Sequence, residues 1–194
     1  MKYFLCLFLL LFSYRVQAQS LPDSDSLFHR FVDHLDTVSA TFHQQKTVLG
    51  MTRRGKSDGH VFFRKGTGFI WEQRNPSYSR FAATKTHWCQ DQGTPKKLSD
   101  LPYFRSVQSM IDTLLSGDFS QLTDWFDPAY LEKGDQWFLT LTPARDDLAD
   151  WVAMIELTGT ASALTRLVFH QADGSVISIQ FAIDTQEVPD DMGC

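Results

Sequence analysis

Few residues of this chain could carry catalytic chemistry, and they are widely spaced. None of the six histidines stands in the H-E-x-x-H spacing of a zinc site, no G-x-S-x-G segment marks a serine nucleophile, and no glycine-rich phosphate loop precedes a predicted helix. His87 and Cys89 are the one base and nucleophile close in sequence, and on a strand they share a face. No orienting acid or oxyanion hole is evident beside them. The sequence therefore predicts no enzyme, no metal site and no cofactor.

A second group of residues indicates binding rather than catalysis. The segment 59–76, GHVFFRKGTGFIWEQRNP, places the basic pair Arg64 and Lys65 among aromatic and branched apolar residues. A strand with one solvated face alternates apolar and polar residues, whereas the adjacent Phe62 and Phe63 put an aromatic ring on each face. Two interpretations stay open at this point. Either protein covers both faces, or one face lines a space that is not a packed core.

The elements that position this segment follow from hydrophobic periodicity. Apolar residues three and four apart predict an amphipathic helix within residues 26–42, and a second helical stripe lies within residues 103–126, with a short helical turn around Phe119 and Leu122. Alternating patterns bounded by glycine turns predict about nine or ten antiparallel strands. The predicted strands cover residues 41–49, 60–63, 69–73, 79–83, 86–90, 129–132, 136–142, 151–158, 164–171 and 175–183.

A sheet of this size is expected to curl into a barrel or half-barrel, because a flat sheet would leave long edges exposed. Aromatic residues make up 13% of the chain, including sixteen phenylalanines, which is more than a core of this size usually needs. A wide barrel encloses a cavity. The composition therefore predicts an apolar ligand site under the helices of residues 103–126.

The ends and the charge of the chain restrict its class. Residues 1–18 have a basic start, an apolar run and a small residue, Ala18, at the end, which predicts a cleaved signal peptide and an exported single domain over residues 19–194. The net charge of −5 makes a nucleic-acid partner improbable. Cys89 and Cys194 follow the leader, and in an oxidising compartment they could form one disulfide.

The order of the segments along the chain is informative in itself. After the leading helix come TFHQQK (41–46), segment 59–76, a strand ending THW (86–88), the inserted helices, GDQWFLTLTP (134–143), IELTGTASALTRLVF (155–169) and DGSVISIQF (173–181). In this order the chain resembles the periplasmic outer-membrane lipoprotein carrier (LolA) family over nearly its whole mature length. The most specific parts are Phe42, Gln44 and Lys46, and the segment 64–71 with Pro76.

The resemblance implies an unclosed antiparallel β-barrel, mainly β with α, with a leading helix and an inserted helical lid over an apolar cavity. It implies a periplasmic carrier that binds acyl chains of lipoproteins and moves them toward the outer membrane. Phe69 and Trp71 match the family's cavity aromatics, and Phe42, Phe63 and Trp88 complete the expected cavity set. The implied partners are acylated lipids or lipoproteins, an inner-membrane donor and an outer-membrane acceptor. A monomer is expected, with no nucleic acid.

The resemblance also implies a basic residue that holds the lid. The family has an arginine followed by proline where this chain has Lys65 and Gly66, so Lys65 is the expected donor. Arg64 is the alternative if the strand register shifts by one residue, because such a shift turns each side chain to the other face. The expected lid residues are Val107, Met110, Ile111 and Leu114.

Two other functions remain open at the level of sequence. A relative of this family could carry a polyene-type or fatty-acid-type product instead of lipoproteins. A lipid-sensing or envelope-stress-sensing module would bind its ligand without transporting it. Co-purifying lipid would favour carriage, whereas a stable complex with an inner-membrane regulator would favour sensing.

Overall fold

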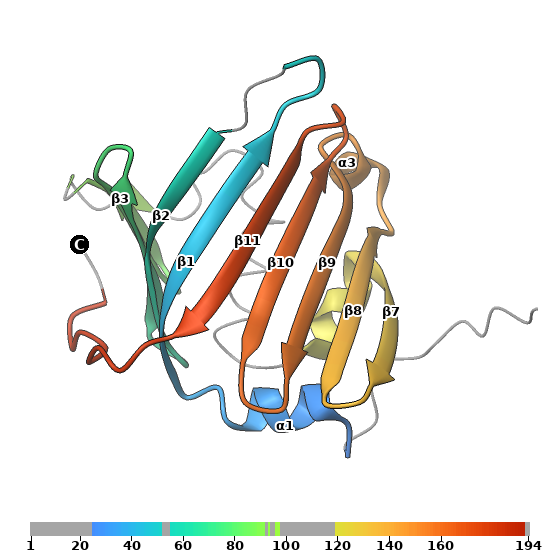
Figure 1. Cartoon of the computed structure of the whole chain (residues 1–194), viewed down its shortest axis with the longest axis horizontal. Coiled ribbons are helices and arrows are strands. Elements are labelled where there is room, and N and C mark those ends of the chain that lie inside the picture. The colour runs from blue at the N-terminus through green and yellow to red at the C-terminus, as the bar shows by residue number, and fades with distance from the viewer. Residues whose placement is uncertain (1–24, 52–54, 92, 94–95, 98–118, 193–194) are drawn as a thin grey trace, which may run out of the picture.

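The architecture was obtained from a computed structural model, which describes residues 25–51, 55–91, 93, 96–97 and 119–192. One 11-stranded antiparallel sheet runs through them (Figure 1). The first half of the chain supplies β1 (Thr37–Thr47), β2 (Gly55–Arg64), β3 (Gly68–Asn75), β4 (Ser79–Thr84), β5 (His87–Gln90) and β6 (Lys96–Lys97). The second half supplies β7 (Phe126–Lys133), β8 (Gln136–Pro143), β9 (Val152–Thr160), β10 (Leu164–Gln171) and β11 (Val176–Ile183).

The sheet consists of two meanders that meet at one strand pair. Strands β1 to β6 follow one another on one side and β11 to β7 on the other, and β1 pairs with β11 in the middle, with Phe42 opposite Phe181. Strands β6 and β7 are the two edges, and within the described residues they do not pair with each other. The predicted unclosed antiparallel fold is therefore confirmed.

The connection from β6 to β7 leaves one edge of the sheet and returns at the other. The predicted lid falls on this connection, but residues 98–118 lie outside the described part of the chain, and the lid residues Val107, Met110, Ile111 and Leu114 lie there with them. The last turn of the connection is a 3-10 helix, η2 (Phe119–Asp124), which confirms the short helical turn predicted there.

The leading helix is shorter than the sequence predicts. Helix α1 (Leu27–Asp33) begins at Ser26, whose hydroxyl accepts a hydrogen bond from the His29 N–H at 3.1 Å. The prediction that the helical stripe continues through Val38 is wrong, because β1 begins at Thr37. Val38 fits a helical stripe, yet it also alternates with Ala40 and Phe42 along a strand, and pairing with β2 decides between the two.

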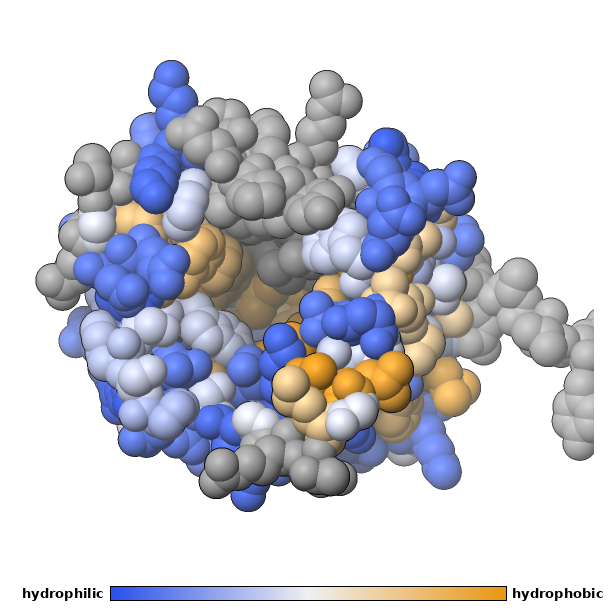
Figure 2. Space-filling view, turned by 90° about the horizontal axis from the view of Figure 1, so that it is seen from above, coloured by the Kyte–Doolittle hydropathy of each residue, from blue (hydrophilic) through white to orange (hydrophobic). Residues whose placement is uncertain are grey.

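The two faces of β2 have different surroundings. Phe63 belongs to a cluster on the inner face, where the hollow seen in Figure 2 lies. Phe62 faces outward into a second cluster that is completed by Val188 and Met192 from the segment after β11. Phe62 is 2% exposed and Met192 1%. Of the two interpretations of the adjacent phenylalanines, the structure supports the second, because protein covers the outer face and the inner face lines a cavity.

Short turns connect the strands as the sequence predicts. The predicted glycine turns lie at KGTG (65–68), KGD (133–135) and ADG (172–174), and each has a glycine at positive φ: Gly66, Gly134 and Gly174. A short helix, α3 (Asp146–Ala149), lies between β8 and β9. Among the described residues, no helix has both the length and the apolar character required to cross a membrane.

Candidate ligand-binding cavity

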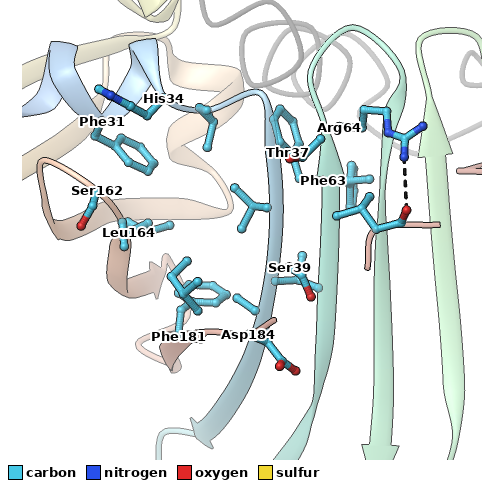
Figure 3. Close-up of a pocket in the computed structure, with 18 of the residues that line it drawn as sticks. Phe31, His34, Thr37, Ser39, Phe63, Arg64, Ser162, Leu164, Phe181 and Asp184 are labelled. Atoms are coloured by element: carbon cyan, nitrogen blue, oxygen red, sulfur yellow. Dashed lines mark hydrogen bonds between the residues drawn. The ribbon is translucent and has the colours of Figure 1, made fainter. Parts of the chain in front are cut away.

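A cavity of about 680 Å³ lies between α1 and the inner face of the sheet and reaches the start of the segment after β11. Figure 3 shows how its side chains come from α1, from β1 and β2, and from the turn between β9 and β10. Most of them are apolar. The apolar lining residues are Phe28, Phe31, Leu35, Val38, Ala40, Val61, Phe63, Phe69, Trp71, Trp137, Leu157, Ala163, Leu164, Leu167, Phe181, Ile183 and Val188.

Three of the five expected cavity residues line this space together. Phe63 pairs with Phe69 across β2 and β3, and Trp71 lies two residues further along β3 on the same face. The rings of Trp71 and Phe42 are stacked with their centroids 4.0 Å apart. Phe42 is fully buried, so it packs against Trp71 and does not line the cavity.

Trp88, the fifth expected residue, lies on the same inner face but outside the lining. Its ring is stacked on Phe81 at 5.8 Å, and Phe81 in turn contacts Phe69 at 5.7 Å. The Trp88 indole N–H donates to the carbonyl of Lys97 at 3.1 Å, which holds the short strand β6. Trp88 therefore extends the aromatic wall toward the edge of the sheet.

The floor of the cavity is built where α1 packs against β8 and β9. Trp137 of β8 is fully buried, and its ring meets Phe28 edge-on at 5.1 Å and Phe31 at 5.4 Å. Its indole N–H donates to the Thr160 carbonyl at 2.8 Å. Gly159 leaves room for this ring, because a Cβ there would lie 2.3 Å from Trp137 Cζ2.

Two side chains of β7 fix the start of α1. Glu132 Oε1 accepts hydrogen bonds from the Leu27 N–H at 2.7 Å and from the Tyr130 hydroxyl at 2.5 Å, and the Tyr130 oxygen accepts from the Phe28 N–H at 3.3 Å. Burial, together with the hydrogen bond to Glu132, raises the pKa of Tyr130 to about 12. The hydrogen bond from Tyr130 lowers the pKa of Glu132. These groups satisfy amides of the first helical turn, which have no partner within the helix.

We call the polar part of the lining the polar rim, and most of it comes from the start of β1, the end of β2 and the segment after β11. The polar lining residues are His34, Thr37, Ser39, Arg64, Ser162, Asp184, Thr185, Gln186 and Glu187. Arg64 Nη2 donates to the Val188 carbonyl at 3.2 Å (dashed in Figure 3), and the guanidinium approaches the Asp190 carboxylate at 3.4 Å. Within the described residues, Arg64 thus holds the segment after β11.

Lys65, the other candidate for the lid contact, begins the turn between β2 and β3. Its backbone N–H donates to the Asp36 carbonyl at 2.8 Å, and its side chain is half-buried. The lid helix lies outside the described residues, so a contact from either Lys65 or Arg64 to the lid stays a prediction.

Asp184 turns the chain from β11 onto the outer face. Its N–H donates to the Ser39 carbonyl at 2.8 Å, and its carboxylate pairs with His60 Nε2 at 2.5 Å. The carboxylate also accepts from the Thr185 N–H at 2.7 Å. The hydrogen bond with His60 is the main cause that lowers the pKa of Asp184. The pair therefore anchors the beginning of the C-terminal segment.

The candidate nucleophile of the sequence has no free thiol. Cys89 is disulfide-bonded and lies 1% exposed in the outer cluster. Its predicted partner, Cys194, lies outside the described residues, so that pairing stays a prediction. Among the residues that the structure describes, no group of three or more histidine, cysteine, aspartate or glutamate side chains could hold a metal ion.

Comparison with known proteins gives matches in structure alone. No known family profile and no curated protein matches the sequence. A LolA superfamily protein of Nitrosomonas europaea superposes with a TM-score of 0.46 at 10% identity, covering 88% of this chain and 96% of that one. MucB in the MucA/MucB complex of Pseudomonas aeruginosa gives 0.43 at 14% identity, covering 84% of this chain and 57% of that one. An outer membrane lipoprotein-sorting protein domain of Vibrio parahaemolyticus gives 0.36 at 8% identity, covering 77% and 87%.

Most of the cavity lining comes from residues that the sequence did not mark as site residues. Phe28 and Phe31 were recognisable as the apolar stripe of a helix, and Phe181 and Ile183 alternate along β11 as on one strand face. These patterns identify a buried face without showing whether core or cavity lies against it. Val188 carried no such signal, because it stands alone in a polar segment.

Proposed function

We propose that this protein is a periplasmic carrier that encloses the acyl chains of lipoproteins, or of a related lipid, in the cavity between α1 and the sheet. The apolar cavity of about 680 Å³ is the observation that supports this function most strongly. Its volume lies within the range of about 300–1,000 Å³ that is common for small-ligand sites. The leader-like residues 1–18 support the periplasmic location.

The hydrophobic effect is sufficient to hold an acyl chain there. Burial of each methylene contributes about 0.8 kcal/mol, so a chain of about ten methylenes gains about 8 kcal/mol, from which the entropic cost of association is subtracted. A carrier must release its cargo, and the smaller net affinity permits release. Phe63, Phe69, Trp71 and the α1 phenylalanines are among the apolar residues that such a chain would contact.

The position of the charges favours an amphiphile over a fully apolar ligand. Arg64, Asp184 and Glu187 all belong to the polar rim between β1, β2 and the C-terminal segment, while the wall formed by β2 and β3 is aromatic. A bound lipid can therefore keep its polar end at the rim and its chain against the aromatic wall, so that no charge is buried without a partner.

We propose that the predicted lid acts on this cavity and that Lys65 holds it. One or two charge-assisted hydrogen bonds from Lys65 to the lid would stabilise a closed state by about 1–3 kcal/mol. Stabilisation of this size biases opening and closing without locking either state. Met110, Ile111 and Leu114 would then supply the apolar contacts of the lid with the cargo.

Displacement of a fluorescent fatty-chain probe from the mature protein tests this function. Val61→Trp places a large ring in the cavity from β2. It is expected to weaken probe binding about tenfold or more, because the ring takes the space that the fatty chain of the probe would occupy. Gln180→Trp is the matched control, since that side chain is exposed on the other face of β11. Equal probe binding by Val61→Trp and the unmodified protein would contradict the proposed cavity.

A further inference from the structure

The connection between β1 and β2 presents two large apolar side chains to solvent. Leu49 is 72% exposed and Met51 64%, the highest values among the large hydrophobic residues that the structure describes as exposed. Both lie in one tight turn, in which the Met51 N–H donates to the Val48 carbonyl at 3.0 Å and Gly50 has φ of +80°. We call residues Val48–Met51 the apolar tip.

The tip is braced against its neighbour rather than extended freely. The Leu49 side chain packs over Gly174 in the turn between β10 and β11, where an added Cβ would lie 3.0 Å from Leu49 Cδ2. In Figure 1 both turns stand at the end of the sheet opposite α1. The view from that end shows exposed hydrophobic atoms at the surface beside the hollow of the half-barrel (Figure 2).

The charge around the tip is opposite in sign to the charge of the chain. The sequence from Lys46 to Lys56 contains four cations and no acid, although the chain carries a net charge of −5. Lys46 and Lys56 lie in β1 and β2 at the base of the tip. Asp173 lies near Lys46, and its carboxylate accepts a hydrogen bond from the Ser175 N–H at 2.8 Å.

We propose that the apolar tip docks on the surface of a bilayer that contains anionic phospholipid. Leu49 and Met51 enter the boundary between headgroups and acyl chains, while the lysines at their base contact the phosphates. Exposed apolar side chains with two lysines at their base match this surface in both polarity and charge. Docking would bring the open end of the half-barrel to the membrane, and it does not depend on which ligand the cavity binds.

Flotation of the mature protein with vesicles tests this docking. Vesicles of phosphatidylcholine with phosphatidylglycerol are expected to carry the protein upward, vesicles of phosphatidylcholine alone much less, and added salt is expected to weaken the binding. The double variant Leu49→Ser with Met51→Ser is expected to bind about tenfold or more weakly, because the inserted apolar area is lost.

Leu131→Ser is the matched control, since Leu131 is 53% exposed in the edge strand β7, away from the tip. This variant is expected to float like the unmodified protein. Lack of vesicle binding by the unmodified protein would overturn docking, and so would equal loss in the control or retained binding in the double variant. Both variants are expected to bind the fatty-chain probe normally, which separates this proposal from that of the cavity.

Discussion

Phe62 and Phe63 are neighbours in strand β2 and belong to two separate hydrophobic clusters. Phe63 lies against Phe69 on the inner face and lines the cavity, while Phe62 is covered on the outer face by Val188 and Met192. The outer cluster of Phe62, Val188 and Met192 stabilises β2, so the strand can form the cavity wall without close packing on its inner face. A half-barrel can thus keep an apolar hollow and still be stable.

Arg64 and Lys65 are expected to act on different segments. Arg64→Gln removes the donor to the Val188 carbonyl, a contact of about 1 kcal/mol, and is expected to accelerate amide exchange in residues 185–192 about fivefold. Lys65→Leu is expected to accelerate exchange in residues 106–115 instead. Arg74→Gln, which breaks a surface ion pair with Glu72, is the control. Faster exchange of residues 106–115 in Arg64→Gln would make Arg64 the lid residue.

Glu132 is expected to stabilise α1 in a pH-dependent way. Because its pKa is lowered in the folded protein, its contribution is present above the ordinary carboxyl pKa and is lost as the pH falls through the folded value. Glu132→Gln is expected to lower the free energy of unfolding by about 1 kcal/mol at neutral pH. Denaturant titrations of both proteins down to acidic pH are expected to converge. A constant difference would contradict this role.

Tyr130 gives an independent check of the same contacts. Its pKa of about 12 lies above the ordinary phenol value, so the stability that it contributes is present below that value and is lost as the pH rises toward 12. The ultraviolet absorbance of phenolate is expected to show one late step that is absent in Tyr130→Phe. A Tyr130 that titrates like a free phenol would show that α1 is not held by this group.

Gly159 is expected to tolerate no side chain. A Cβ would lie 2.3 Å from Trp137 Cζ2 and 2.5 Å from the Ala163 carbonyl, so Gly159→Ala forces the cavity floor apart and is expected to cost about 3 kcal/mol. Gly55→Ala is the control, since its nearest atom would lie 3.7 Å away. Thermal unfolding of the two variants measures the difference. Similar midpoints would contradict the packing of Trp137.

The disulfide of Cys89 is expected to involve Cys194. Closure of the loop between them would stabilise the fold by about 4–5 kcal/mol in the chain-entropy model. Cys194→Ser is expected to release one thiol at Cys89, detected by thiol titration of the denatured, unreduced protein, and to lower the unfolding midpoint in denaturant. If Cys89 remains oxidised in Cys194→Ser, the pairing is wrong.

The fold was predictable from the sequence because its strands are local and separated by turns with clear glycine signals. Gly66, Gly134 and Gly174 marked three turns, because glycine adopts the positive φ of each turn without steric cost. The boundary of α1 was not predictable in the same way. Val38 fits both periodicities, and its assignment depends on pairing with β2, which a local pattern does not contain.

The aromatic wall was predictable to the extent that it lies on adjacent strands. Phe69 and Trp71 share a face because side chains two residues apart on a strand point the same way. The register of the β2–β3 hairpin places Phe63 on that face too. Phe42 and Trp88 share that face too. Whether a residue lines a cavity or lies beneath the lining depends on its neighbours in three dimensions, which the alternation along a strand does not show. The role of Arg64 depends on a segment more than a hundred residues later in the chain, and no local signal could indicate it.

Mass spectrometry of lipid extracted from the natively purified mature protein tests the central claim most directly. The proposed function predicts an acylated lipid or lipoprotein at about one molecule per protein, and its loss from the Val61→Trp variant but not from Gln180→Trp. The acyl species found would also decide between lipoprotein and another lipid as cargo. Protein that contains no lipid and fails to bind a fatty-chain probe would contradict the account.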